Sequence, residues 1–130
     1  MEEKGSYGPI VLDHFTHPRN MGEMENPDGM GEAQNPVCGD TIRLFIKVEA
    51  GRIVDAKFLT FGCGAAIASS SITTEMIKGK TIEEALAISD EVIAEALGGL
   101  PPTKIHCSIL SEEAIRAAVL DYRKKVTKVS

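Results

Sequence analysis

The feature that most constrains the fold is a cysteine between two glycines, at the junction of a strand and a helix. Residues 53–61 are rich in β-branched and aromatic side chains and predict a strand, whereas residues 65–78 predict a helix. Cys63 lies at the junction, and its neighbours Gly62 and Gly64 permit a tight turn that leaves the sulfur uncrowded. Unpaired N–H groups at a helix start favour a thiolate. We therefore interpret Cys63 as a presented, reactive sulfur rather than as a small core residue.

Length and composition indicate one globular domain over residues 1–130, of which we expect residues 1–5 to be flexible. Hydrophobic residues make up 43% of the chain and charged residues 25%, an ordinary balance for a protein with a packed core. The net charge of −5 argues against a nucleic-acid-binding surface, and no apolar run is long enough to cross a membrane. The N-terminus lacks the pattern of a secretory signal, so we expect a cytoplasmic protein.

Three cysteines, Cys38, Cys63 and Cys107, are spread along the chain. An odd number cannot all pair within one chain, and a reducing compartment keeps thiols free. The sequence contains no C-x-x-C pair, which argues against a thioredoxin-type redox site and against a zinc ribbon. Any site shared by these cysteines must therefore be assembled by the fold.

A predicted hairpin brings two of these cysteines together. Residues 41–48 alternate apolar and polar side chains, and residues 53–61 return antiparallel after a turn. Cys38 and Asp40 precede the first strand, and Cys63 follows the second. Because those two ends lie side by side in an antiparallel hairpin, we expect the three side chains to converge.

The remaining segments predict an α+β fold, a small antiparallel three-stranded sheet covered on one face by several helices. His14 and His17 belong to the N-terminal part, and we interpret both as surface or boundary histidines because no cysteine is nearby in sequence. The expected elements are a short helix at 7–15, a loop or irregular edge strand at 20–35, a helix after a capping box at 81–84, a helix capped by Ser89, a stiff extended segment at 100–104, and a last helix that follows residues 105–108 and runs to about 125.

Five residues at the ends of these elements are candidate metal ligands. Three thiolates with a carboxylate or an imidazole suit a tetrahedral soft or borderline metal, either zinc or iron in an iron–sulfur cluster. Asp40 could instead be an ordinary turn residue, and His106 a structural histidine. An oxygen ligand matches sulfide-bound iron poorly, so we expect such a site to release its cargo more readily than four thiolates would. The candidates are Cys38, Asp40, Cys63, His106 and Cys107.

Over nearly its whole length the chain resembles the IscU/NifU-type iron–sulfur cluster assembly scaffolds. Several unusual strings occur in the family's order. These are Asp13-His14, Pro18-Arg19-Asn20, Cys38-Gly39-Asp40, Phe61-Gly62-Cys63-Gly64, residues 66–71, Leu100-Pro101-Pro102 and residues 104–110. The absence of an insertion between the second and third cysteines, and the presence of His106, place the chain on the IscU side rather than the SufU side of the family.

The resemblance implies a SufE/NifU-like fold and a scaffold, not an enzyme, that builds a [2Fe–2S] cluster from iron and desulfurase-derived sulfur and transfers it to recipient apo-proteins. The implied ligands are Cys38, Cys63 and Cys107 with Asp40 or His106, and zinc can take the place of iron. Cys107 is the implied acceptor of a persulfide, a reaction that requires thiolate attack.

The resemblance also implies partners. They are a cysteine desulfurase and an Hsp70-type chaperone with its J-type co-chaperone, and a ferredoxin or a frataxin-like protein and a homodimer are further candidates. The chaperone-recognition segment is Leu100, Pro101, Pro102, Thr103 and Lys104, in which Thr103 replaces the family's valine and weakens an apolar contact.

Two rival functions remain on this evidence. One is a zinc-binding sulfur acceptor that partners a cysteine desulfurase. The other is an enzyme with Cys107 as nucleophile and His106 as base, but adjacent residues point in different directions on most backbones, so this dyad is poorly arranged.

Overall fold

The structure is a computed structural model that describes residues 8–35, 39–62, 64–99 and 105–129; at 105–106 and 126–129 only the backbone is described. Residues 1–5, Cys38, Cys63 and the predicted chaperone-recognition segment at 100–104 lie outside the described residues. The elements in chain order are α2 (Pro9–Thr16), β1 (Gly29–Gln34), β2 (Thr41–Glu49), β3 (Arg52–Phe61), α3 (Gly64–Ile77), α4 (Ile82–Leu86), α5 (Asp90–Ala96) and α6 (Ile105–Val129).

The predicted sheet is confirmed, with three antiparallel strands in the order β1-β2-β3. Strands β2 and β3 pair from Thr41↔Phe61 to Glu49↔Arg52, with an irregularity after Lys47. Ala50 and Gly51 join them, both with positive φ, as a tight hairpin turn requires. The segment predicted as a loop or edge strand divides into a loop and strand β1.

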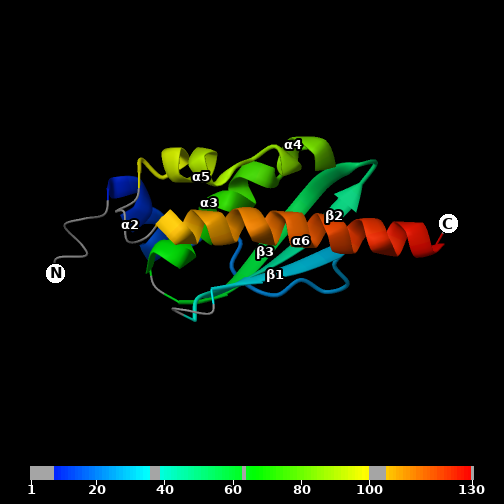
Figure 1. The fold of residues 1–130 in the computed structure, drawn as a ribbon, viewed down its shortest axis with the longest axis horizontal. Coiled ribbons are helices and arrows are strands. Elements are labelled where there is room, and N and C mark those ends of the chain that lie inside the picture. Colours follow the sequence, from blue (N-terminus) through cyan, green and yellow to red (C-terminus); the bar gives the residue numbers. More distant parts are fainter. Residues whose placement is uncertain (1–7, 36–38, 63, 100–104, 130) are drawn as a thin grey trace.

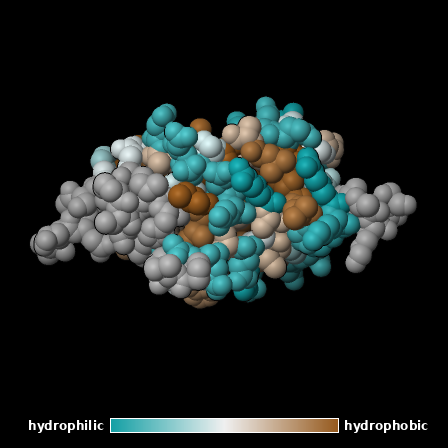
Figure 2. All heavy atoms as spheres, viewed as in Figure 1, coloured by the Kyte–Doolittle hydropathy of each residue, from teal (hydrophilic) through white to brown (hydrophobic). Residues whose placement is uncertain are grey.

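Helices cover one face of this sheet, with α6 lying lengthwise along it and α3 beside α6 (Figure 1). The inward positions of the strands, among them Ile42, Leu44 and Phe58, are almost inaccessible and form one core with side chains of α3, α5 and α6. Burying this apolar surface is the main source of the fold's stability. On the face seen in Figure 2, hydrophilic side chains cover much of the described surface and separate smaller hydrophobic areas.

Helix α3, which the sequence predicts over residues 65–78, is buried over most of its circumference rather than along a single stripe. It contacts the sheet, α2, α5 and α6, so its hydroxyl residues at 69–71 and 73–74 are inside as well. Small side chains allow neighbouring elements to approach from several sides at once, which explains why a run of serines forms part of a core helix.

Helix α6 packs directly on the edge strand β1 through two glycines. A Cβ added at Gly31 would lie 2.7 Å from two atoms of Ala117, and one added at Gly29 would come closer still to the backbone oxygen of Ala118. The Asp121 carboxylate accepts a 2.9 Å hydrogen bond from the Met30 N–H, which pairs an edge-strand donor. The helix is longer than predicted, because residues 105–108 already belong to its first turn and it continues to Val129.

Local signals for the short helices are confirmed. Thr81 and Glu84 form the predicted capping box at α4, and Ser89 accepts from the Val92 N–H at the start of α5. Within the described residues, no helix combines the length and apolar character needed to span a bilayer.

Candidate functional site

The ends of β2 and β3 place Asp40 against Gly62. Thr41 pairs with Phe61, so the residues just outside this pair lie side by side. A Cβ added at Gly62 would meet the Asp40 carboxylate, with Oδ1 at 2.5 Å and Cγ at 2.8 Å. Asp40 is only 6% exposed. The carboxylate thus occupies the space that any side chain at position 62 would need.

The same carboxylate faces the thiol of Cys107. Cys107 Sγ lies 3.9 Å from Asp40 Oδ2, within reach of a weak S–H···O hydrogen bond. Cys107 is fully buried and packs with Ala65 and Ala66 in the first turn of α3. One carboxylate therefore links the start of β2, the end of β3 and the first turn of α6.

Two of the five candidate ligands are thus placed together, Asp40 and Cys107. Cys38, Cys63 and the side chain of His106 lie outside the described residues. In sequence, Cys38 is two residues before Asp40, and Cys63 stands between Gly62 and Gly64. Among the side chains that the structure describes, no group of three or more His, Cys, Asp or Glu could hold a metal ion.

The aromatic ring of Phe15 covers the other flanking glycine. A Cβ added at Gly64 would lie 3.1–3.2 Å from three ring atoms of Phe15. The two glycines around Cys63 therefore have different neighbours, a carboxylate at Gly62 and an aromatic ring at Gly64. The first contact follows from the hairpin, whereas the second could not be predicted from sequence spacing, since Phe15 and Gly64 are far apart in the chain.

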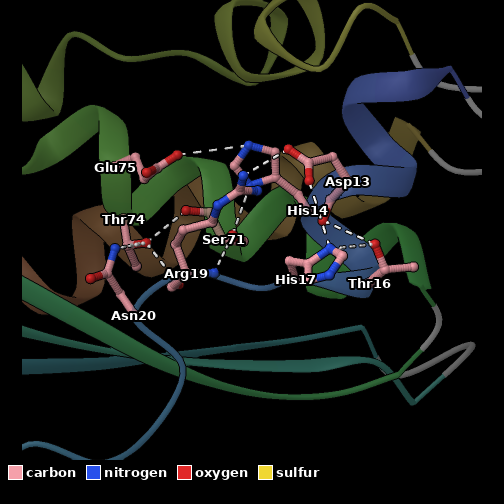
Figure 3. Close-up of polar contacts among 9 residues, drawn as sticks. All are labelled: Asp13, His14, Thr16, His17, Arg19, Asn20, Ser71, Thr74 and Glu75. Atoms are coloured by element: carbon pink, nitrogen blue, oxygen red, sulfur yellow. Dashed lines mark hydrogen bonds and ion pairs between the residues drawn. The ribbon is translucent and has the colours of Figure 1, made fainter.

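The interpretation of His14 as a surface or boundary histidine is wrong, because His14 is buried, only 6% exposed. Its Nδ1 lies 2.8 Å from Ser71 Oγ, and its Nε2 lies 3.7 Å from Glu75 Oε1 (Figure 3). Burial lowers the pKa of His14 below its ordinary value, the nearby Arg19 charge lowers it further, and Glu75 and Asp13 oppose both effects. His17, in contrast, is exposed as predicted.

Arg19 completes this polar group, which we call the His14 cluster (Asp13, His14, Arg19, Ser71 and Glu75). His14 and Ser71 are its buried members, whereas Asp13 and Glu75 are exposed. The backbone N–H of Arg19 donates to Ser71 Oγ at 2.9 Å, and its guanidinium donates to Asp13 Oδ2 at 2.7 Å. This hydrogen bond from Arg19 lowers the pKa of Asp13. The cluster joins α2 and the following loop to α3, a role that only the matching strings Asp13-His14 and Pro18-Arg19-Asn20 could have signalled.

A cavity of about 330 Å³ opens beside this cluster and is lined by Arg19, Asn20, Glu75 and Lys78. Its two cations already have partners, since Arg19 pairs with Asp13 and Lys78 lies 3.6 Å from Asp55 and 3.3 Å from Asn20 Oδ1. Neither of the two described candidate ligands, Asp40 and Cys107, is among its described lining residues, and we assign it no part in the site.

Comparison of the chain with known proteins identifies its family. The family model described as "NifU-like N terminal domain" matches residues 6–129. The chain belongs to this family. The NifU-like chain is 57% identical over 123 residues to the "Iron-sulfur cluster assembly scaffold protein IscU 1" of Archaeoglobus fulgidus, which covers 95% of this chain and 80% of the relative. It is 56% identical over 124 residues to the IscU scaffold protein of Azotobacter vinelandii, covering 92% of this chain and 96% of the relative.

Solved structures agree with this family assignment. A putative iron–sulfur cluster assembly scaffold protein for the SUF system from Fervidobacterium islandicum matches with a TM-score of 0.73 at 25% identity, covering 88% of the NifU-like chain and 97% of that protein. The N-terminal part of a NifU-like protein from Brucella abortus matches with a TM-score of 0.72 at 17% identity, covering 92% and 96%, and shows the shared fold.

Proposed function

We propose that this protein is a scaffold on which an iron–sulfur cluster is assembled and from which it is transferred to recipient proteins. The observation that carries the proposal is the Asp40 carboxylate, held between Gly62 and the Cys107 thiol. The family assignment and the scaffold names of relatives 53–57% identical over most of the chain support it.

The donor set suits a cluster that must be both held and released. A buried carboxylate and a neighbouring thiolate repel each other when both are ionised, and a bound cation relieves that repulsion. We propose that Cys38, Cys63 and Cys107 bind a [2Fe–2S] cluster with Asp40 or His106 in the fourth position. Oxygen is a harder ligand than a thiolate, so coordination by Asp40 keeps the cluster labile.

Assembly requires partners, and we propose a cysteine desulfurase as the sulfur source. Cys107 accepts the sulfur as a persulfide by thiolate attack on the desulfurase persulfide, which releases the desulfurase thiolate. The segment 100–104 is the proposed site for an Hsp70-type chaperone with its J-type co-chaperone, and a ferredoxin and a frataxin-like protein are further candidate partners. In this role the protein is a carrier of its cargo rather than a turnover enzyme.

Anaerobic reconstitution with ferrous iron, cysteine, a cysteine desulfurase and a thiol reductant, which helps to reduce the persulfide sulfur to sulfide, tests the proposal. We expect the visible absorption of a sulfide-bridged iron cluster, with iron and sulfide in equal amounts. Cys63→Ser should abolish stable binding, because an alcohol is a poor ligand for such iron. Asp55→Ala is the control, since Asp55 is a half-buried carboxylate of β3 whose partner is Lys78.

Two results would contradict the proposal. A wild-type protein that stays colourless under these conditions and binds only zinc would favour the sulfur-acceptor alternative. A full cluster in Cys63→Ser would remove Cys63 from the site.

A further inference from the structure

Helix α2 is held on α3 at two places that lie two helical turns apart. Near its C-terminal end, His14 contacts Ser71, and the next residue, Phe15, covers Gly64. Positions 64 and 71 of α3 are seven residues apart and so lie on the same side of that helix. One side of α2, which carries Val11, His14 and Phe15, therefore packs along α3 from Ser71 to Gly64, the first residue of α3.

The His14 cluster fixes this arrangement. Arg19 N–H and His14 both bond to the single hydroxyl of Ser71, so the end of α2 and the following loop are tied to one point on α3 (Figure 3). The ion pair of Arg19 with Asp13 closes the loop back on α2. These contacts surround the buried pair His14 and Ser71, and together they hold the end of α2 against α3. The position of the Phe15 ring follows from this packing.

The ring stands where a side chain of residue 64 would be. Its Cδ1, Cε1 and Cγ atoms are 3.1, 3.2 and 3.2 Å from the position of a Cβ on Gly64, which is tighter than ordinary van der Waals contact. Phe15 is 42% exposed, so part of the side chain packs against the protein and part is at the surface. The ring thus separates the first residue of α3 from solvent on that side.

We propose that Phe15 is a positioning and shielding residue for the cluster: its ring fixes the backbone that follows Cys63 and slows the loss of bound iron to the solvent. This inference rests on the proposed function, because Cys63 is a proposed ligand. The apolar surroundings of a metal site control the access of water and the local dielectric. Phe15 supplies such surroundings from an element, α2, that carries none of the proposed ligands.

The test compares Phe15→Ala with Ile10→Ala. Ile10 is a matched control because it lies on the same helix, is also 42% exposed, and lies near Gly98 rather than Gly64. Each variant is reconstituted anaerobically as the full chain. The loss of the cluster's visible absorption is then timed after addition of EDTA, and the melting temperature of each apo-protein is measured.

We expect the cluster of Phe15→Ala to decay at least about threefold faster than that of the wild type, a modest effect beside the roughly 10–100-fold changes that outer-shell substitutions cause at metal sites. Phe15→Leu keeps part of the apolar cover and should be intermediate. The cluster of Ile10→Ala should decay at the wild-type rate, even if the melting temperature of its apo-protein is as low as that of Phe15→Ala.

Equal decay rates in Phe15→Ala and Ile10→Ala would overturn the inference, whether both match the wild type or both are faster, because the effect would then be absent or a result of general destabilisation. In that case the proposed function would still stand if the wild type forms a cluster and Cys63→Ser does not. A wild type that forms no cluster would overturn both.

A second variant probes the contact itself. Gly64→Ala adds a methyl group where the ring stands and should also accelerate decay. In the Phe15→Ala background the methyl group meets no ring, so we expect Gly64→Ala to cause no further acceleration there. Additive effects of the two substitutions would contradict the contact as the cause.

Discussion

A substitution at Gly62 should lower the stability of the protein by displacing the carboxylate of Asp40, a residue 22 positions away in the chain. In Gly62→Ala the new methyl carbon would lie 2.5 Å from Asp40 Oδ1 and 2.8 Å from Cγ. Since an ordinary contact needs about 3.4 Å, the carboxylate must move by about 0.9 Å, or about 25° of side-chain rotation. A rotation of that size away from a preferred rotamer costs about 0.5–1.5 kcal/mol.

The backbone adds a second cost that must be separated from the first. Gly62 has φ = 159°, a value that side-chain-bearing residues rarely adopt, so alanine is strained there whatever its neighbours. Combining Gly62→Ala with Asp40→Ala removes the contacts with the carboxylate, leaves the 3.2 Å contact with the Cβ of residue 40, and keeps the backbone strain. The difference between the two backgrounds isolates the contact, and we expect a coupling free energy of about 1 kcal/mol.

Urea unfolding of the four apo-proteins (wild type, both single variants and the double variant) measures this coupling. Gly62→Ala should be less destabilising when Asp40 is already alanine. The four loaded proteins give an independent measurement, because Gly62→Ala should slow cluster transfer to an apo-ferredoxin in the same direction as Asp40→Ala. A coupling free energy below about 0.3 kcal/mol, the limit for independent sites, would refute the placement of Asp40 over Gly62.

Three further predictions concern the labile ligand, the buried histidine and the helix–strand contact. Asp40→Ala should lengthen the cluster's lifetime and slow its transfer to an apo-ferredoxin, and faster transfer would contradict the lability argument. Because burial depresses the pKa of His14 from its ordinary 6.5, the unfolded chain binds the proton more readily, so stability should fall as the pH drops below about 6.5. In urea unfolding between pH 5 and 8, the midpoint of His14→Gln should depend less on pH than that of the wild type. The exposed His17 serves as the control, and His17→Gln should keep the wild-type pH dependence. Gly31→Ala forces its methyl group into the α6 backbone and should cost about 2 kcal/mol, against a smaller loss for Met30→Ala on the same strand. For 130 residues that corresponds to a fall of about 7 °C in the melting temperature, and an unchanged melting temperature would disprove the close approach.

The strands and short helices could be predicted because their signals are local. Alternation in residues 41–48 and the polar turn after them define the hairpin, and the register of that hairpin places Asp40 beside Gly62. The side chains of the capping residues Thr81 and Ser89 likewise accept hydrogen bonds from the N–H groups three positions on in the chain.

The packing around the site could not be predicted, since it depends on contacts between distant segments. Nothing near His14 in sequence indicates that it bonds to Ser71 in a core helix, so the sequence predicts a surface residue. The docking of Cys107 against Ala65 and Ala66 depends on how α6 lies on the sheet, which spacing along the chain does not encode. Glycines that serve close approach, such as Gly31, look the same in sequence as those that serve turns.

The length of α6 has a practical consequence for experiments on this protein. From Cys107 to Val129 the helix rises about 33 Å, at 1.5 Å per residue, and Figure 1 shows its last turns at the opposite end of the long axis from α2. A fluorophore or affinity tag attached after residue 129 would therefore stand well clear of the Cys107 thiol. The end of α6 is thus a suitable attachment point for kinetic measurements of cargo transfer.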